Sequence, residues 1–135
     1  MPRQQINLNV LPFLVCLSGG LLLIFIQQFV RFHLPPSGFL PLFFGFAPNL
    51  IVGVSFPFSI LMKPRAFTRS QAKKLFLLWC AGTILLLIGF EILRPFRGAQ
   101  TFDYLDLLAS IIGVAIGFFI YHFWLERRLI FGQES

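Results

Sequence analysis

Three of the five acidic residues in this 135-residue chain lie within sixteen positions of one another, with two arginines between them. The carboxylates belong to Glu91, Asp103 and Asp106, and the guanidinium groups belong to Arg94 and Arg97. Such groups can form ion pairs, transfer protons in catalysis, or bind a divalent cation or another polar ligand. Because the chain offers no activated nucleophile and no second ligand set, we favour a role without catalysis and keep an enzyme as the open alternative.

The spacing of these residues also offers each carboxylate a structural role. Arg94 follows Glu91 at position i+3, near enough for a salt bridge at the end of a helix. Asp103 is placed to cap the next helix, and Asp106 then occupies the third helical position, where it opposes the positive end of the helix dipole. We expect Asp106 to point into the protein, towards Glu91 and the loop arginines, and to matter more than Asp103.

Small residues continue the face of the helix that Asp106 begins. Ser110, Gly113 and Gly117 follow it at i+4, i+7 and i+11, which places all four on one side. The glycines form a GxxxG pair, a spacing that lets two helices approach closely in lipid. We predict that Ser110, Gly113 and Gly117 pack against another helix, either the third span or a second copy of the protein.

The remaining polar residues carry little chemistry. His33 has no second ligand nearby in the sequence, and His122 lies among aromatic residues typical of a membrane interface. Cys16 and Cys80 lie singly in apolar runs, as small buried side chains do. We therefore expect no metal, no cofactor and no catalytic residue.

The composition indicates an integral membrane protein. Hydrophobic residues make up 57% of the chain and charged residues 12%, whereas a soluble domain is about 45–50% apolar and about one quarter charged. Disordered chains have low hydrophobicity, so the same figures exclude disorder. Four apolar stretches reach the ~20 residues that a membrane-spanning helix needs. They cover about 10–30, 38–62, 75–93 and 104–125. We predict an all-α, four-helix transmembrane bundle that forms one domain over residues 1–135, with the first span retained rather than cleaved.

The second span contains three prolines, Pro41, Pro48 and Pro57. Each removes a backbone donor and disturbs the preceding turn. We expect a kink near Pro48, with a broken helix lining a substrate path, as in transporters, as the alternative.

The formal net charge of +6 has an uneven distribution along the chain. If the N-terminus lies inside, eight basic residues fall on the inner side: Arg3, Lys63, Arg65, Arg69, Lys73, Lys74, Arg127 and Arg128. Arg31, Arg94 and Arg97 then fall outside. The positive-inside rule thus predicts that both termini are cytoplasmic. We expect the inner basic residues to contact membrane lipids rather than nucleic acid.

The third and fourth spans resemble the VanZ-like family of small bacterial membrane proteins. The resemblance covers roughly the last 50 residues and rests on Gly89-Phe90-Glu91, Arg97, Phe102-Asp103-x-x-Asp106 and Gly113-x-x-x-Gly117. This chain has Arg94 where the family often has glutamine, and Ser110 where asparagine is usual. The family takes its name from a determinant of resistance to the glycopeptide teicoplanin. The resemblance implies a bacterial inner-membrane setting and an outward-facing polar cluster.

Two functions follow from these patterns. In the first, Glu91, Arg97, Asp103 and Asp106 bind a polar component of the envelope. In the second, the chain is an accessory subunit without catalytic activity that packs, through the fourth span, against a larger membrane complex or another copy.

Overall fold

A computed structural model of the chain describes residues 10–62, 66–97 and 103–128, without the side chains of Arg31 and Arg97. The regular secondary structure of these residues is entirely helical. Four of the described helices are long and apolar enough to cross a membrane, which confirms the predicted all-α, four-helix membrane fold. In lipid, a helix is favoured because it satisfies its own backbone hydrogen bonds.

Each membrane-spanning helix consists of an α-helix, and three of them continue as a helix of another type. The first is α1 (Leu11–Phe25) with the π-helix η1 (Ile26–Val30), followed by the 3-10 turn η2 (Arg31–His33). The second is α2 (Phe39–Ser55) with the 3-10 helix η3 (Phe56–Met62). The third is α3 (Arg69–Leu93), after which a short 3-10 turn, η5 (Pro95–Arg97), follows. The fourth is α4 (Tyr104–Ile120) with the π-helix η6 (Tyr121–Leu125).

The helix of the third span begins before the apolar stretch that the sequence predicts. The prediction began at residue 75, where the apolar run starts, but the helix begins at Arg69. A capping box explains the extension: the Thr68 hydroxyl accepts from the Gln71 backbone N–H at 3.3 Å, and the Gln71 side chain accepts from the Thr68 N–H at 3.0 Å. Hydropathy marks the apolar part of a helix, whereas the cap marks its first residue.

In the second span, the helix type changes next to Pro57, whereas Pro48 lies within the α-helix, and the kink expected near Pro48 stays a prediction. Pro48 is buried inside α2, and the α-helix continues through it without a change of helix type. The change to a 3-10 helix comes at Phe56, just before Pro57. Because Pro57 has no N–H, it cannot donate to the carbonyl of Gly53, so the α-helical pattern cannot continue there.

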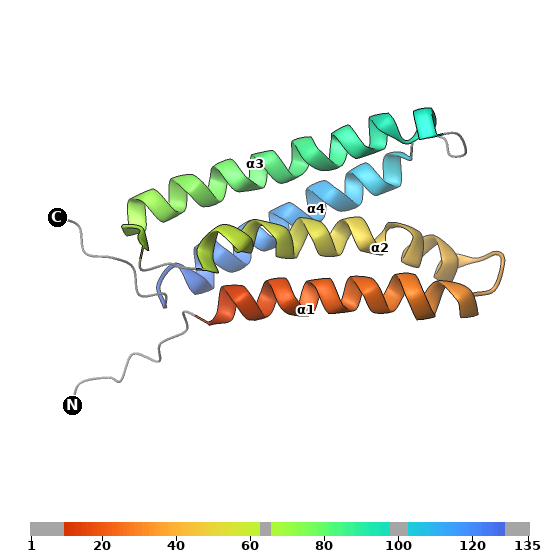
Figure 1. The fold of residues 1–135 in the computed structure, drawn as a ribbon, viewed down its shortest axis with the longest axis horizontal. Helices are drawn as coiled ribbons and strands as arrows, with labels where there is room; N and C mark the ends of the chain where they lie inside the picture. The colour runs from red at the N-terminus through yellow and green to blue at the C-terminus, as the bar shows by residue number, and fades with distance from the viewer. Residues whose placement is uncertain (1–9, 63–65, 98–102, 129–135) are drawn as a thin grey trace.

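The four helices alternate in direction along the bundle (Figure 1). We call the end where α1 and α3 begin the Leu11 end, and the end where α3 stops and α4 begins the Glu91 end. The most extensive helix pair is α2 with α4, which run in the same direction. On one side α1 packs against α2 and η3, and on the other α3 packs against α4 and η3.

A buried aromatic cluster lies towards the Leu11 end. Phe76 of α3 stacks on Tyr121 of η6, with ring centroids 4.3 Å apart, and meets Phe58 of η3 edge-on at 5.3 Å. All three rings are buried, together with Leu61 and Leu125. This cluster holds η3, α3 and η6 together, so the apolar core and the polar cluster of the Glu91 end lie at different levels of the bundle.

The glycine face of α4 packs against α2. A Cβ placed on Gly113 would collide with the backbone oxygen of Leu50, and one on Gly117 would lie 2.9 Å from the oxygen of Val54. The partner helix is therefore neither the third span nor a second copy, the two options that the sequence left open. Packing of another chain through α4 stays a prediction, and it would have to use a different face of the helix.

Candidate functional site

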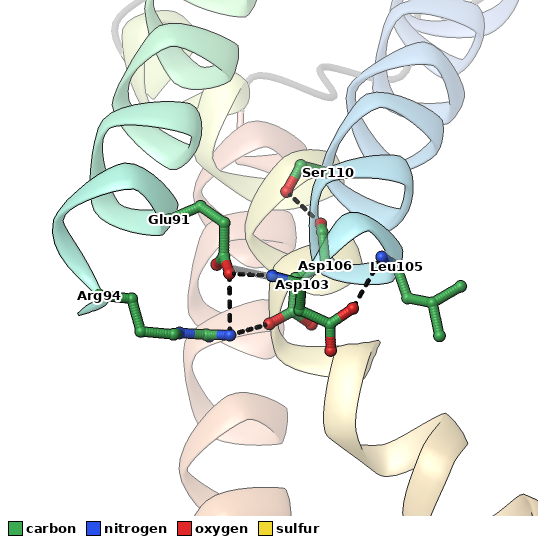
Figure 2. A network of polar contacts seen from close by, with 6 residues as sticks. All are labelled: Glu91, Arg94, Asp103, Leu105, Asp106 and Ser110. Carbon is green, nitrogen blue, oxygen red and sulfur yellow. Dashed lines mark hydrogen bonds and ion pairs between the residues drawn. The ribbon is translucent and has the colours of Figure 1, made fainter. Parts of the chain in front are cut away.

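The candidate site lies where the end of α3 meets the start of α4, at the Glu91 end of the bundle (Figure 2). Glu91 belongs to the last turn of α3, and Arg94 is the residue that follows this helix. Asp103 is the N-cap of α4, and Asp106 lies in its first turn. The antiparallel arrangement of α3 and α4 brings these four residues together across their connection.

Arg94 is the centre of the cluster. Its Nη1 atom lies 3.1 Å from Oε1 of Glu91 and 2.7 Å from Oδ2 of Asp106 (Figure 2). One guanidinium group therefore bridges a carboxylate of α3 and a carboxylate of α4. Hydrogen bonds between charged groups are the stronger kind, so this bridge joins the two helices at their ends.

Glu91 also positions the first residue of the α4 segment. Its Oε1 atom accepts a hydrogen bond of 2.8 Å from the backbone N–H of Asp103, in addition to the contact with Arg94. The Asp103 carboxylate in turn accepts from the backbone N–H of Leu105 at 2.8 Å. This confirms the predicted N-cap and shows that the Asp103 side chain is engaged with its own helix.

Ser110 occupies the interface rather than the polar cluster. Its hydroxyl donates to the backbone carbonyl of Asp106 at 2.8 Å, one turn earlier in α4 (Figure 2). The side chain thereby satisfies its polar group within the helix, where it is 2% exposed. Ser110 can thus lie against α2 without leaving an unpaired donor in the bundle.

Burial and charge differ among the three side chains of the bridge. The side chains of Glu91 and Asp106 are 5% and 7% exposed, whereas that of Arg94 is 31% exposed. With Asp103, the described part of the cluster holds two more carboxylates than guanidinium groups. The cluster thus has one partly exposed cation, Arg94, which is paired with two buried carboxylates.

Of the two loop arginines, the sequence favours Arg97 as a ligand-binding residue, whereas the structure places Arg94 in the cluster. The side chain of Arg97 lies outside the described part of the structure, so its relation to the cluster stays a prediction. The sequence predicts Arg94 as a partner of Glu91 and does not place it among the ligand-binding residues, whereas the structure makes it the centre of the cluster. Its i+3 spacing from Glu91 was the available signal, whereas its contact with Asp106 depends on how α4 folds back.

The described residues contain no group of three His, Cys, Asp or Glu side chains arranged to hold a metal ion. The two histidines have local partners. Nδ1 of His33 lies 2.7 Å from the carbonyl oxygen of Phe29, and Nδ1 of His122 lies 3.2 Å from a carboxylate oxygen of Glu126, a contact that is an ion pair when the histidine is protonated. Their geometry fits local roles at the helix ends.

Fold and site together define a multi-pass, all-α membrane protein with a bridged carboxylate–arginine cluster at one end. No protein-family model, no curated protein and no solved structure matches this chain. The resemblance to the VanZ-like family thus rests on the residues quoted above and stays a prediction.

Proposed function

We propose that this chain is a VanZ-like protein of the bacterial inner membrane whose polar cluster, at the Glu91 end, faces outwards and binds a polar component of the envelope. Both termini would then lie in the cytoplasm. The observation that carries the proposal is the position of Arg94, which is partly exposed at a helix end and held between two buried carboxylates.

The distribution of basic residues supports the proposed orientation. The Leu11 end has Arg69, Lys73 and Lys74 in the first turns of α3, and Arg127 and Arg128 after η6. Basic residues concentrate on the cytoplasmic side of membrane proteins. Arg3, Lys63 and Arg65, which belong to the same prediction, lie outside the described residues.

The hydrogen-bonding capacity of Arg94 supports the proposed binding. A guanidinium group has five N–H donors in a planar fork, and within the described residues both contacts of Arg94 involve Nη1. The carboxylates hold the group in place, so that its remaining donors can meet a carboxylate, phosphate or carbonyl oxygen of a ligand. A group fixed in advance in this way loses less entropy when it binds.

The ligand of the cluster would be a polar headgroup of the envelope or a glycopeptide-like molecule, and a thermal-shift titration with teicoplanin, the glycopeptide associated with the family's name, tests the second of these. The purified chain in detergent should show a melting temperature that rises with teicoplanin concentration, since a ligand of the folded state stabilises it. Arg94→Met should lose the shift. Arg128→Met, at the opposite end of the bundle, is the matched control and should keep it. Absence of a shift in the wild-type chain, or equal shifts in all three, would contradict teicoplanin-like binding by the cluster.

A second candidate is the accessory subunit, and the surface of α3 favours it. Gly82 and Gly89 lie two helical turns apart on one side of α3, and a Cβ on either would meet no atom within 4 Å. Such an open, small-residue face permits the close approach of a helix from another chain. Purification in mild detergent tests this role, which predicts stoichiometric partner subunits that Gly82→Leu displaces; a chain that purifies alone would contradict it.

A further inference from the structure

An apolar groove runs between α1 and the second span, away from the polar cluster. It has a volume of about 330 Å³, which lies within the range of about 300–1,000 Å³ found for ligand sites. It extends from Met62, the last residue of η3, to Leu23 in the second half of α1. The groove therefore begins at the Leu11 end and reaches into the membrane-spanning part of the bundle.

The polar side chains that line the groove have partners inside the protein. The Cys16 thiol donates to the backbone carbonyl of Ser55 at 3.2 Å, and the Ser55 hydroxyl donates to the carbonyl of Ile51 at 2.7 Å. The hydroxyl oxygen of Ser59 accepts from the indole N–H of Trp79 at 2.8 Å. The remaining lining consists of glycines, hydrocarbon side chains and the thioether of Met62, so the groove favours an apolar occupant over a polar one.

Gly20 lines the groove and leaves open space beside it. A Cβ on this residue would meet no atom within 4 Å, although the neighbouring Gly19 packs tightly against Ser55. A side chain at position 20 could therefore extend into the groove without displacing the contact between α1 and α2. A substitution at position 20 should therefore fill the groove and leave the packing between α1 and α2 intact.

The end of the bundle at which the groove opens carries basic residues. Among the described residues of the Leu11 end are Arg69, Lys73 and Lys74 at the start of α3, which packs against η3. Basic residues at a membrane surface attract anionic lipid headgroups. We propose that the groove holds one acyl chain of an anionic phospholipid, whose headgroup lies at the basic Leu11 end.

Native mass spectrometry of the full chain tests this site. The chain is reconstituted with equal amounts of phosphatidylglycerol and phosphatidylcholine, extracted in mild detergent, and measured for retained lipid. The wild type should retain one phosphatidylglycerol in preference to phosphatidylcholine. Gly20→Phe should retain about tenfold less, equivalent to about 1.4 kcal/mol. Gly45→Phe, in α2, is the matched control, because a Cβ there also meets no atom within 4 Å, and it should retain lipid as the wild type does.

Two results would overturn the proposal: equal retention by Gly20→Phe and the wild type, or equal retention of the two lipids by the wild type. If Gly20→Phe does not fold, the smaller Gly20→Val is measured in its place. A second measurement uses the fluorescence of Trp79 in a Trp124→Phe chain. Phosphatidylglycerol with brominated acyl chains should quench this fluorescence, and the quenching should saturate at one lipid per chain. Quenching that does not saturate would also contradict a single site. Arg94 does not line the groove, so a failed test of lipid binding would leave the proposed function untouched.

Discussion

Gly53 and Gly113 face each other across the contact between α2 and α4. A Cβ on either residue would lie 3.1 Å from the Cα of the other, closer than side chains ordinarily pack. The two backbones are thus in direct contact at this point, where many small dispersion terms add up. In lipid, where no hydrophobic force drives helices together, such close packing is a main source of association.

Leucine at this contact should separate α2 from α4. We expect Gly53→Leu and Gly113→Leu to destabilise the protein by about 1–3 kcal/mol or more, because backbone atoms cannot move aside as a flexible side chain can. Thermal unfolding in detergent measures the effect. Gly45→Leu, in the same helix as Gly53 but with open space around its Cβ, should be nearly neutral. Equal stability of all three variants would contradict the observed packing.

The two aspartates of α4 should differ in importance. Asp106→Asn removes a buried carboxylate from Arg94 and should destabilise the protein by about 2–4 kcal/mol, below the full cost of breaking a buried pair because Arg94 is partly exposed. Asp103→Asn keeps a good N-cap residue and should change stability by less than about 0.5 kcal/mol. Chemical or thermal unfolding of both variants decides the point, and equal effects would mean that the ion pair contributes little.

A charge exchange identifies the partner of Asp106. Arg94→Asp and Asp106→Arg should each be strongly destabilising, since each leaves like charges together at the junction of α3 and α4. The double variant should recover part of the loss. Recovery stays partial because Glu91 then faces an aspartate at position 94. The same exchange made with Arg97 should recover less, and greater recovery with Arg97 would show that the bridge is assigned to the wrong arginine.

Tyr121 combines a buried ring with a buried hydroxyl that has no hydrogen-bond partner among the described residues. An unsatisfied buried polar group costs about 1–3 kcal/mol, so Tyr121→Phe should raise the stability by up to about that amount. Tyr121→Leu should lower it, because the stacking on Phe76 is lost. A destabilised Tyr121→Phe variant would show that the hydroxyl has a partner after all.

The spans were predictable from sequence because the length of an apolar run determines whether a helix can cross the membrane. Which helix packs against which was not predictable from the sequence. The face of α4 that carries Gly113 follows from helical periodicity, but its partner residue Gly53 lies in a proline-containing span with no comparable repeat. Hydropathy describes which residues leave water and does not specify which helix meets which. Contacts between α2 and α4 arise only when the bundle is assembled.

The candidate site was predictable to a similar extent. The cap at Asp103 and the pairing of Glu91 with Arg94 are local, so spacing along one helix end was enough to suggest them. The contact between Arg94 and Asp106 joins two helices and depends on the return of the chain between them. A long arginine side chain can reach in several directions, so the sequence did not distinguish Arg94 from Arg97 as the partner of Asp106.

The proposed function requires the Glu91 end to lie outside the cytoplasm, and cysteine labelling in intact cells tests this most directly. Phe96→Cys and Ser70→Cys place a single thiol at exposed positions near opposite ends of α3, in a chain whose Cys16 and Cys80 are replaced by alanine. A membrane-impermeant maleimide, with any outer membrane permeabilised, should label the Phe96→Cys chain and leave the Ser70→Cys chain unlabelled until the cells are lysed. Labelling of Ser70→Cys alone in intact cells would place the Arg94 cluster in the cytoplasm and contradict its proposed role in binding an envelope component.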